Sequence, residues 1–217
     1  NILVHYHSSD PSQVRDTIQE IKSHGVDAFD VQADISQPEG VDVIFEAIQE
    51  RFGRLDIVVN SASTFQQRQL LDVTLEDWNT TMNVNVRAPF LITQRAVPLM
   101  EQNAIPGGVI VNIVDQGVDG PWITHPHHGI SKLALWGLTQ VTAVSLGPTI
   151  RANAVLPGPV MKPAGRNMSD EDWAKIGERN PLKKTGSGED VARAVLYLCQ
   201  EDFLTGTLIH VNAGEHL

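Results

Sequence analysis

The sequence of 217 residues contains one cysteine, Cys199, and no long hydrophobic run. One cysteine cannot form an intramolecular disulfide or a cysteine-based metal cluster, and the apolar run 195–199 around it is typical of a protein core. No stretch approaches the roughly 18 apolar residues of a membrane helix, and residues 1–5 lack the basic and apolar regions of a signal peptide. We therefore expect a cytoplasmic protein without a membrane partner.

Positive charge is also scarce. Lysine and arginine number 16 against 26 aspartates and glutamates, which gives a net charge of -10, and no run of five or more basic residues occurs. Proteins that bind duplex nucleic acid or anionic membranes carry a concentrated positive surface, so we expect neither partner. With 41% hydrophobic residues the chain can bury one core and is short for two, which predicts a single domain over residues 1–217.

Short runs rich in Val and Ile alternate with longer segments of helical period, as in a parallel α/β sheet. The expected strands are Ile2–His5, Ala28–Gln32, Ile57–Asn60, Val109–Val114, Arg151–Val155 and Thr207–Val211. The expected helices are Ser9–His24, Gly40–Phe52, Glu76–Gln102 with one break, Ser131–Leu146 and Gly188–Gln200. Strands that are apolar on consecutive residues belong to sheets covered on both faces. We therefore predict one doubly wound parallel sheet of the Rossmann-like, dinucleotide-binding kind.

A glycine-rich turn between a first strand and a first helix is missing. Rossmann-like folds use this turn to bring the backbone close to a pyrophosphate. Gly107 and Gly108 precede a strand instead, and Gly186 and Gly188 follow a loop. We expect that the natural protein has a strand–turn–helix unit of roughly 30 residues before Asn1. In the strand order 3-2-1-4-5-6 the strand of that unit is central, and its loss leaves unpaired edges inside the sheet.

Small and polar residues follow several of the expected strands, where they suit a ligand at the carboxyl edge of the sheet. At strand ends stand Ala33-Asp34-Ile35-Ser36, Asn60-Ser61-Ala62-Ser63, Val111-Asn112-Ile113-Val114-Asp115, the run 151–159 that ends in Pro157-Gly158-Pro159, and the ending Thr205-Gly206-Thr207 with Val211-Asn212-Ala213-Gly214. Two further segments, Asn85-Val86-Arg87-Ala88-Pro89-Phe90 and Gly129-Ile130-Ser131-Lys132, lie in or at the start of expected helices. In this order and spacing they resemble the short-chain dehydrogenase/reductase family over essentially the whole chain, from that family's second strand onward.

A closer resemblance lies in the run from Asn60 to Phe65, followed by Leu70-Leu71, together with Asp115. It is similar to the pteridine reductase and alternative dihydrofolate reductase branch. There an Asp replaces the usual active-site Ser, and an aromatic residue stacks on the pterin. The resemblance implies that Phe65 is the stacking platform and that Asp115 faces the substrate, roles that suit a flat heteroaromatic ring with an amino-pyrimidine edge. The alternatives are a loop residue tucked into the core for Phe65 and a strand-end cap for Asp115.

The same resemblance implies further site residues. Lys132 binds the nicotinamide ribose and lowers the pKa of the proton-transfer group, and Asn85 holds a water in the proton relay. The remaining cofactor contacts implied at the carboxyl edge are Asn60, Ala62, Pro157 and Gly158. A lone helical lysine is usually a solvated surface residue, but the apolar neighbours of Lys132 favour a buried position.

His128 stands where the family has its proton-donating Tyr, four residues before Lys132. Neither Tyr6 nor Tyr197 lies where it can replace that residue. Three interpretations remain open: His128 is the acid, the protein binds nucleotide without ordinary reduction, or the proton comes through water and Asp115. An imidazolium is a stronger acid than a phenol, but positive charge nearby favours its neutral form. We hypothesise that a carboxylate–imidazolium pair of Asp115 and His128 replaces the Tyr.

The neighbouring histidines do not predict a metal site. Adjacent side chains in His125-Pro126-His127-His128 do not converge on one ion, so we expect no metal and interpret His125 and His127 as part of a solvated substrate loop. Cofactor choice is indicated after the first strand. His7, Ser8 and Ser9 offer neutral or cationic donors to a 2′-phosphate, so NADPH is the expected cofactor, with Asp34 at the adenine edge. For Asp34 the alternative is a helix cap.

The sequence thus predicts an NADPH-dependent reductase of a pterin, dihydrofolate-like or other cyclic C=N or C=O substrate. The segment Pro159–Pro181 is the expected substrate lid, with Met161 as an adaptable contact. One alternative is a catalytically silent NADP-binding protein that acts as a sensor or assembly partner, and another is an enzyme for sugars or alcohols. By resemblance we expect a homo-oligomer, a dimer or tetramer, paired through the helices 76–102 and 131–146.

Overall fold

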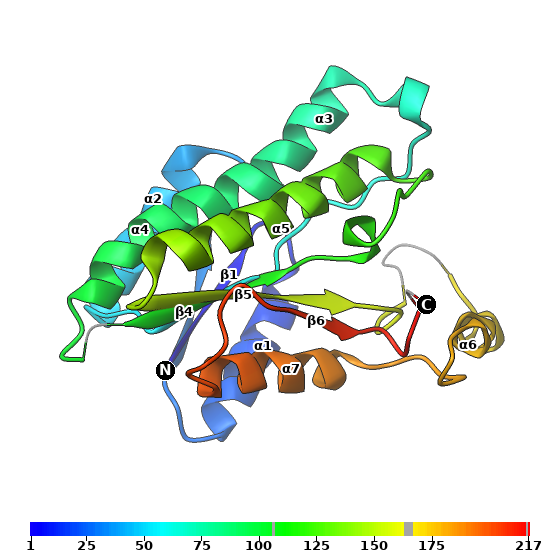
Figure 1. The fold of residues 1–217 in the computed structure, drawn as a ribbon. Helices are drawn as coiled ribbons and strands as arrows, with labels where there is room; N and C mark the ends of the chain where they lie inside the picture. Colours follow the sequence, from blue (N-terminus) through cyan, green and yellow to red (C-terminus); the bar gives the residue numbers. More distant parts are fainter. Residues whose placement is uncertain (106, 163–166, 216) are drawn as a thin grey trace.

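A computed structural model describes residues 1–105, 107–162, 167–215 and 217. Strands and helices alternate along the chain as predicted (Figure 1). The strands are β1 (Ile2–Tyr6), β2 (Ala28–Gln32), β3 (Ile57–Asn60), β4 (Gly108–Ile113), β5 (Ile150–Pro157) and β6 (Leu208–Val211). The helices are α1 (Pro11–Ser23), α2 (Pro38–Arg51), α3 (Leu75–Met82), α4 (Ala88–Glu101), α5 (Pro126–Leu146), α6 (Asp170–Arg179) and α7 (Gly188–Gln200). The short helical turns are η1 (Leu70–Asp72), η2 (Asn83–Arg87) and η3 (Gln116–Val118).

All paired strands are parallel, and they form two sheets. β1 pairs with β2, while β3, β4, β5 and β6 follow one another in a second sheet. The α/β class and the parallel arrangement are therefore confirmed. Among the described residues β1 and β3 do not pair with each other, so unpaired strand edges lie inside the layer of strands, where the sequence predicted them.

Helices cover both faces of the strands. On one face α2, α4 and α5 bury a core that includes Met100 and Ile110, and on the other face α1 and α7 pack on separate parts of the sheets (Figure 1). The α7 core holds Val109, Val111 and Leu198. Strands with apolar residues toward both layers require this double cover, as the sequence predicted. No helix within the described part of the chain is long and apolar enough to cross a membrane.

Several element boundaries differ from the prediction for identifiable reasons. Helix α5 begins at Pro126, five positions before the predicted Ser131, because proline suits the first position of a helix. Between α3 and α4 the expected break is a single π-helical turn, η2, so the axis continues. Helix α6 was missed inside the expected lid, although Ser169 caps it and its first turn is acidic.

Candidate active site

Asp115 and His128 meet just beyond the carboxyl end of β4. The carboxylate caps η3, since Oδ1 of Asp115 accepts a hydrogen bond from the backbone N–H of Gly117 at 2.8 Å. Its second oxygen, Oδ2, contacts Nε2 of His128. The side chains of His128 and Asp115 are only 4% and 17% exposed, so water screens the pair weakly. Asp115 is thus both the strand-end cap and the partner that the hypothesis requires.

The early start of α5 sets this contact. Pro126 occupies the first position of α5, which places His128 in the first turn and Lys132 one turn later on the same side of the helix. The spacing of four residues in the sequence therefore becomes a shared face toward the end of β4. Lys132 donates from Nζ to the carbonyl oxygen of Ile113, the last residue of β4, at 2.8 Å.

Both ring nitrogens of His128 face oxygen acceptors. Nδ1 lies 2.7 Å from the carbonyl oxygen of Thr64, and Nε2 contacts the Asp115 carboxylate. A carbonyl oxygen only accepts, so Nδ1 carries a hydrogen in this arrangement. A neutral ring then has no hydrogen left for Nε2, and the second contact needs one more proton, held on Nε2 or on Asp115. The geometry therefore suits a pair that stores one transferable proton.

Asn85 joins this network from the π-helical turn between α3 and α4. Its side chain is fully buried, Oδ1 accepts from the backbone N–H of Thr64 at 2.9 Å, and Nδ2 donates to Oγ of Ser131 at 2.9 Å. Nδ2 also lies 3.3 Å from Nδ1 of His128. A π turn inserts one extra residue into a helix and is frequent at functional sites. Asn85 thereby fixes the loop whose Thr64 carbonyl orients the His128 ring.

Lys132 is held in an unusual protonation range. Burial lowers the pKa of its ammonium group to about 8, and the negative charge of Asp115 opposes part of that effect. The ammonium has three N–H groups, and the structure shows one hydrogen bond from it, to Ile113, among the described residues. Two donors of a buried cation are thus available to a ligand at this edge of the sheet.

An aromatic cluster surrounds the Asp115–His128 pair. Phe65 stacks on the ring of His125 with centroids 4.2 Å apart and packs edge-to-face against His128 at 4.8 Å. Trp122 lies 5.3 Å from Phe65 and 4.9 Å from His125. Phe65 is half exposed and is not tucked into the core, so part of its ring surface remains open to a substrate.

The interpretation of His125 and His127 as solvated loop residues is wrong. Both side chains are buried, His125 in the aromatic cluster and His127 with only 1% exposure in the first turn of α5. The proline between them starts a helix and does not prolong a loop, which is why they turn inward. Within the described residues no group of three or more His, Cys, Asp or Glu side chains is arranged to hold a metal ion.

The predicted cofactor residues at the end of β1 lie at the surface. His7, Ser8 and Ser9 are exposed between β1 and α1, and the next carboxylate in the chain, Asp10, caps α1 by accepting from Ser12. Asp34, after β2, accepts from the backbone N–H of Ser36 at 2.9 Å. Hydrogen bonds from Ser36 lower the pKa of the Asp34 carboxyl. Its predicted role at the adenine edge stays a prediction beside this observed local cap.

The other predicted cofactor residues occupy the ends of β3 and β5. Asn60 is buried and donates to Oδ1 of Asn112 at 2.8 Å, so its side chain links β3 to β4. Ala62 is exposed two residues later. Pro157 ends β5. A Cβ added at Gly158 would lie 2.7 Å from Asn212, so glycine permits the close approach of the segments that follow β5 and β6. Because the side-chain amide of Asn60 is engaged with Asn112, a ligand at this position would contact the backbone of Asn60 more readily than its side chain.

The structure does not bring Met161 to the Asp115–His128 pair. Its side chain is 76% exposed beyond β5. Residues 163–166 of the expected lid lie outside the described residues, and the part from Asp170 to Arg179 forms α6. The substrate contact of Met161 therefore remains a prediction.

Sequence reasoning missed three contributors to this site. They are the Thr64 carbonyl, the Ser131 hydroxyl and the indole of Trp122. A carbonyl group carries no sequence signal, because every residue has one. Trp122 had a detectable signal, since it precedes the proline-led helix start in the same segment as His125.

Comparisons with known proteins agree with this geometry. A family model described as Enoyl-(Acyl carrier protein) reductase matches residues 1–216. Glucose 1-dehydrogenase 2 of Bacillus subtilis is 32% identical over 221 residues, which cover 99% of this chain and 84% of that protein.

Two solved structures are similar over 99% of this chain. One is the FolM alternative dihydrofolate reductase 1 of Brucella canis complexed with NADP (TM-score 0.89, 26% identity, 83% of that chain covered). The other is a blue fluorescent protein from a metagenomic library in complex with NADPH (TM-score 0.87, 30% identity, 87% covered). The fold, the paired Asp115 and His128 with Lys132 one turn on, and these matches together show that the chain belongs to the short-chain dehydrogenase/reductase family.

Proposed function

We propose that this protein is an NADPH-dependent oxidoreductase that reduces a cyclic C=N or C=O bond in a flat heteroaromatic substrate of the pterin or dihydrofolate kind. The observation that carries the proposal is the contact between His128 Nε2 and Asp115 Oδ2 beside Lys132 and Phe65. It supplies a proton donor in a protein whose family places Tyr at this position. Membership of the family supports the oxidoreductase class.

The proton step follows from the hydrogen bonds of His128. The substrate nitrogen or oxygen takes the proton shared by Nε2 and Oδ2 and becomes N–H or O–H. After this transfer the ring remains neutral and still donates from Nδ1 to the Thr64 carbonyl, so its orientation is kept. The Asp115–His128 pair then takes up a new proton from solvent, and the contact between Nε2 and Oδ2 is restored.

The residues present fit a nicotinamide cofactor at two separated places. The buried ammonium of Lys132 has donors for ribose hydroxyls, and His7, Ser8 and Ser9 present neutral or cationic donors where a 2′-phosphate would lie. The Asp10 carboxylate accepts hydrogen bonds from Ser12, so it is engaged in capping α1 and is less available to accept from the adenosine ribose hydroxyls, as an acidic residue does in NAD-binding proteins. When bound, the reduced nicotinamide supplies the hydride. NADP and NADPH in the two solved relatives support this choice of cofactor.

The aromatic cluster supports a flat substrate. Phe65, half exposed and 4.8 Å from the His128 ring, offers an apolar surface close to the proton donor. The similarity to a dihydrofolate reductase of Brucella canis points in the same direction. His125 already stacks on Phe65, so the substrate meets the remaining exposed part of that ring.

The test is NADPH oxidation by protein from the complete reading frame, with dihydropterin and dihydrofolate as acceptors. We expect turnover by the natural sequence and a loss of about 100-fold in kcat for Asp115→Asn, because the amide cannot share the proton. NADPH binding, followed by fluorescence, should stay nearly unchanged in this variant. Binding of NADPH without turnover of either acceptor or of a sugar or alcohol would contradict the proposal and favour a nucleotide-binding protein without reductase chemistry.

We further propose a homo-oligomer, dimer or tetramer, in the cytoplasm. Exposed apolar side chains along α5 support the oligomer, among them Ile130, Leu133, Val141 and Val144. Size-exclusion chromatography with light scattering tests the oligomer directly.

A further inference from the structure

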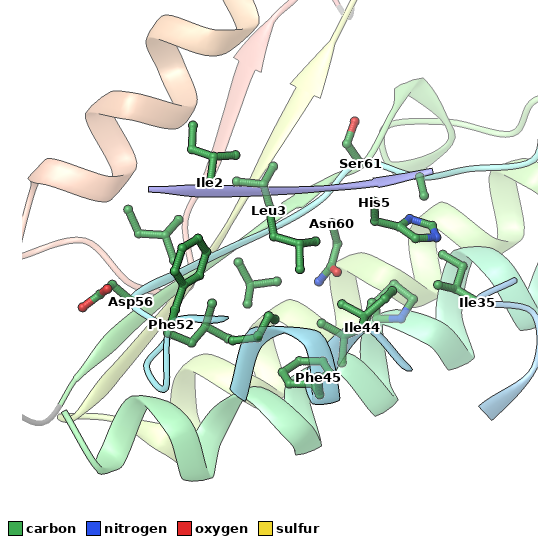
Figure 2. Close-up of a pocket in the computed structure, with 18 of the residues that line it drawn as sticks. Ile2, Leu3, His5, Ile35, Ile44, Phe45, Phe52, Asp56, Asn60 and Ser61 are labelled. Atoms are coloured by element: carbon green, nitrogen blue, oxygen red, sulfur yellow. The ribbon is translucent and has the colours of Figure 1, made fainter. Parts of the chain in front are cut away.

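A small pocket lined by His127 differs from the large cavity between β1 and β3. That cavity, of about 1130 Å³, is closed on one side by α2 and α4 (Figure 2). Its polar side chains His5 and Asn60 have partners, the carbonyl oxygen of Ala33 at 2.9 Å and the side chain of Asn112 at 2.8 Å. The small pocket, of about 330 Å³, lies between η1, α3 and the first turn of α5. Here His127 has no hydrogen-bond partner among the described residues.

Apolar side chains form the rim of this small pocket, and His127 forms its floor. Leu70, Leu75 and Ile130 are 66%, 75% and 45% exposed, whereas His127 is 1% exposed. Trp78 of α3 adds an indole to the wall. We call this space the His127 pocket. A ligand that enters it passes an apolar rim before it reaches an imidazole that is shielded from solvent.

The imidazole of His127 has unused hydrogen-bonding capacity. Both ring nitrogens are buried, and within the described part of the chain neither has a partner. A buried donor or acceptor without a partner is costly, so native proteins rarely keep one that nothing contacts. The proton-sharing contact with Asp115 is made by His128, so it does not occupy the ring of His127. The floor of the pocket is therefore suited to a ligand that brings a hydrogen-bonding group.

The His127 pocket presents no charge to a ligand. No Asp, Glu, Lys or Arg side chain of the described residues lines it. Burial lowers the pKa of His127 below its ordinary value, so the ring is uncharged at neutral pH. The negative charge of Asp77 opposes this effect, but Arg68 pairs with that carboxylate through hydrogen bonds of 3.1 and 3.2 Å. An ion would lose its hydration here without gaining a charged partner, which favours a neutral ligand.

We propose that the His127 pocket binds a small neutral molecule with a hydroxyl group on an apolar ring, of which phenol is the simplest. A neutral imidazole has one N–H donor and one acceptor nitrogen. A hydroxyl both donates and accepts, so it suits either nitrogen. The apolar ring packs against Trp78 and Leu75. A volume of about 330 Å³ is at the small end for ligand pockets and accommodates a compound of one ring. The site is separate from the Asp115–His128 pair, and the inference does not depend on the proposed reaction.

Titration with phenol tests the proposal on protein from the complete reading frame, with the ¹⁵N signals of the histidine rings as the readout. Toluene is the matched probe, because it has the same ring and a methyl group in place of the hydroxyl. We expect phenol to shift the ring signals of His127 and to bind with a Kd at least about tenfold lower than that of toluene. The absence of saturable phenol binding, or toluene binding as tight as that of phenol, would overturn the proposal.

His127→Phe removes both nitrogens and keeps an aromatic ring on the floor of the pocket. Its spectrum also identifies the His127 signals by their loss. Phenol should bind this variant about tenfold more weakly, whereas toluene should bind it at least as tightly as it binds the natural protein. Unchanged phenol affinity would place phenol at another site and would contradict the proposal.

A second variant tests the rim without changing His127. Leu75 is the first residue of α3, where a carboxylate is favourable to the helix, so Leu75→Glu preserves the fold. It should weaken phenol binding by at least about fivefold, because a charge replaces part of the apolar wall. Leu182→Glu is the matched control, since Leu182 is 64% exposed and lies outside the pocket. Equal Kd values for the two variants would refute the assigned site.

A second copy of the chain is the competing occupant. Ile130 belongs both to the rim of the His127 pocket and to the exposed face of α5 proposed for the oligomer. If a partner side chain fills the pocket, the ring signals of His127 will change with protein concentration and phenol will not shift them. That result would overturn the proposal and identify the pocket as a subunit contact.

Discussion

The surroundings of His128 differ from the cavity between β1 and β3 in how their polar groups are partnered. Around His128 both ring nitrogens have acceptors from other elements: Nε2 contacts Asp115 at the end of β4, and Nδ1 contacts the carbonyl of Thr64 in the loop after β3. At that cavity β1 and β3 lie apart, and within the described part of the chain neither has a strand partner on the side that faces the other.

The groups proposed for proton transfer and the residues predicted to bind the cofactor lie in different parts of the molecule. The Asp115–His128 pair is organised by β4, α5 and the turn η2, all within the second sheet and its covering helices. The predicted cofactor residues are divided between the two sheets, with His7, Ser8 and Ser9 after β1 and Lys132 on α5. The proposed proton transfer and the predicted contacts at His7, Ser8 and Ser9 therefore lie in different parts of the fold, and we expect single substitutions to perturb them independently.

The largest expected effect is on the proton donor. His128→Ala removes the imidazole that contacts Asp115, so we expect kcat to fall by about 10²- to 10⁴-fold at saturating NADPH. His127→Ala is the matched control, because it removes a neighbouring buried imidazole that lies outside the pair, and its kcat should stay within about threefold of the natural value. Steady-state NADPH oxidation measures both variants. Equal losses in the two would mean that folding, and not proton donation, limits the activity.

The second prediction compares β4, which pairs with a strand on each side, with β3, which pairs with β4 alone among the described strands. Ile110 of β4 is fully buried, so Ile110→Ala should lower the free energy of unfolding of the chain 1–217 by about 2–5 kcal/mol. Ile57→Ala on β3 should lower it by less than about 1 kcal/mol in the same chain, because the side chain is half exposed. Urea denaturation measures both values. Equal losses for the two variants would contradict this difference between the strands.

A third prediction concerns the pH dependence of stability through Lys132. Its pKa is about 8 in the folded protein against an ordinary value of 10.5, so the unfolded chain holds the proton more strongly between these pH values. The buried charge therefore destabilises the fold by about 3 kcal/mol below pH 8, and this penalty disappears as the pH rises toward 10.5.

Lys132→Met removes that titration. We expect the unfolding free energy of the variant, relative to the natural protein, to decrease steadily between pH 8 and 10. Lys175→Met on the exposed surface of α6 serves as the control, because nearby carboxylates raise the pKa of Lys175 above this window. A flat difference for Lys132→Met from pH 7 to pH 10 would refute the assigned pKa.

The smallest expected effect is on substrate affinity. Phe65→Ala should raise KM for a dihydropterin by about tenfold and change kcat less, because the ring contributes stacking and no proton. Phe203→Ala, at another exposed phenylalanine outside the aromatic cluster, should leave KM unchanged. Parallel assays with an acyclic carbonyl substrate sharpen the result, since the loss should be confined to the flat substrate.

Local patterns predicted much of the fold. Ala28–Gln32, Ile57–Asn60 and Gly188–Gln200 have the expected bounds, because apolar runs and capping residues act over a few neighbouring positions. Helix α5 was misjudged at its start, where the histidines looked like a polar loop. The ring of His125 is buried against Phe65 and Trp122, which meet it only in the folded chain.

The sequence by itself determined the α/β alternation, the resemblance to the family and the spacing that places His128 and Lys132 on one helical face. Only the tertiary structure decided that the Thr64 carbonyl, 64 residues away, orients His128, that Asn85 approaches from 43 residues away, and that β1 and β3 remain apart. The physical reason is range. Periodicity and capping act between near neighbours along the chain, whereas hydrogen bonds between distant segments and the pairing of strand edges depend on how the completed layers pack.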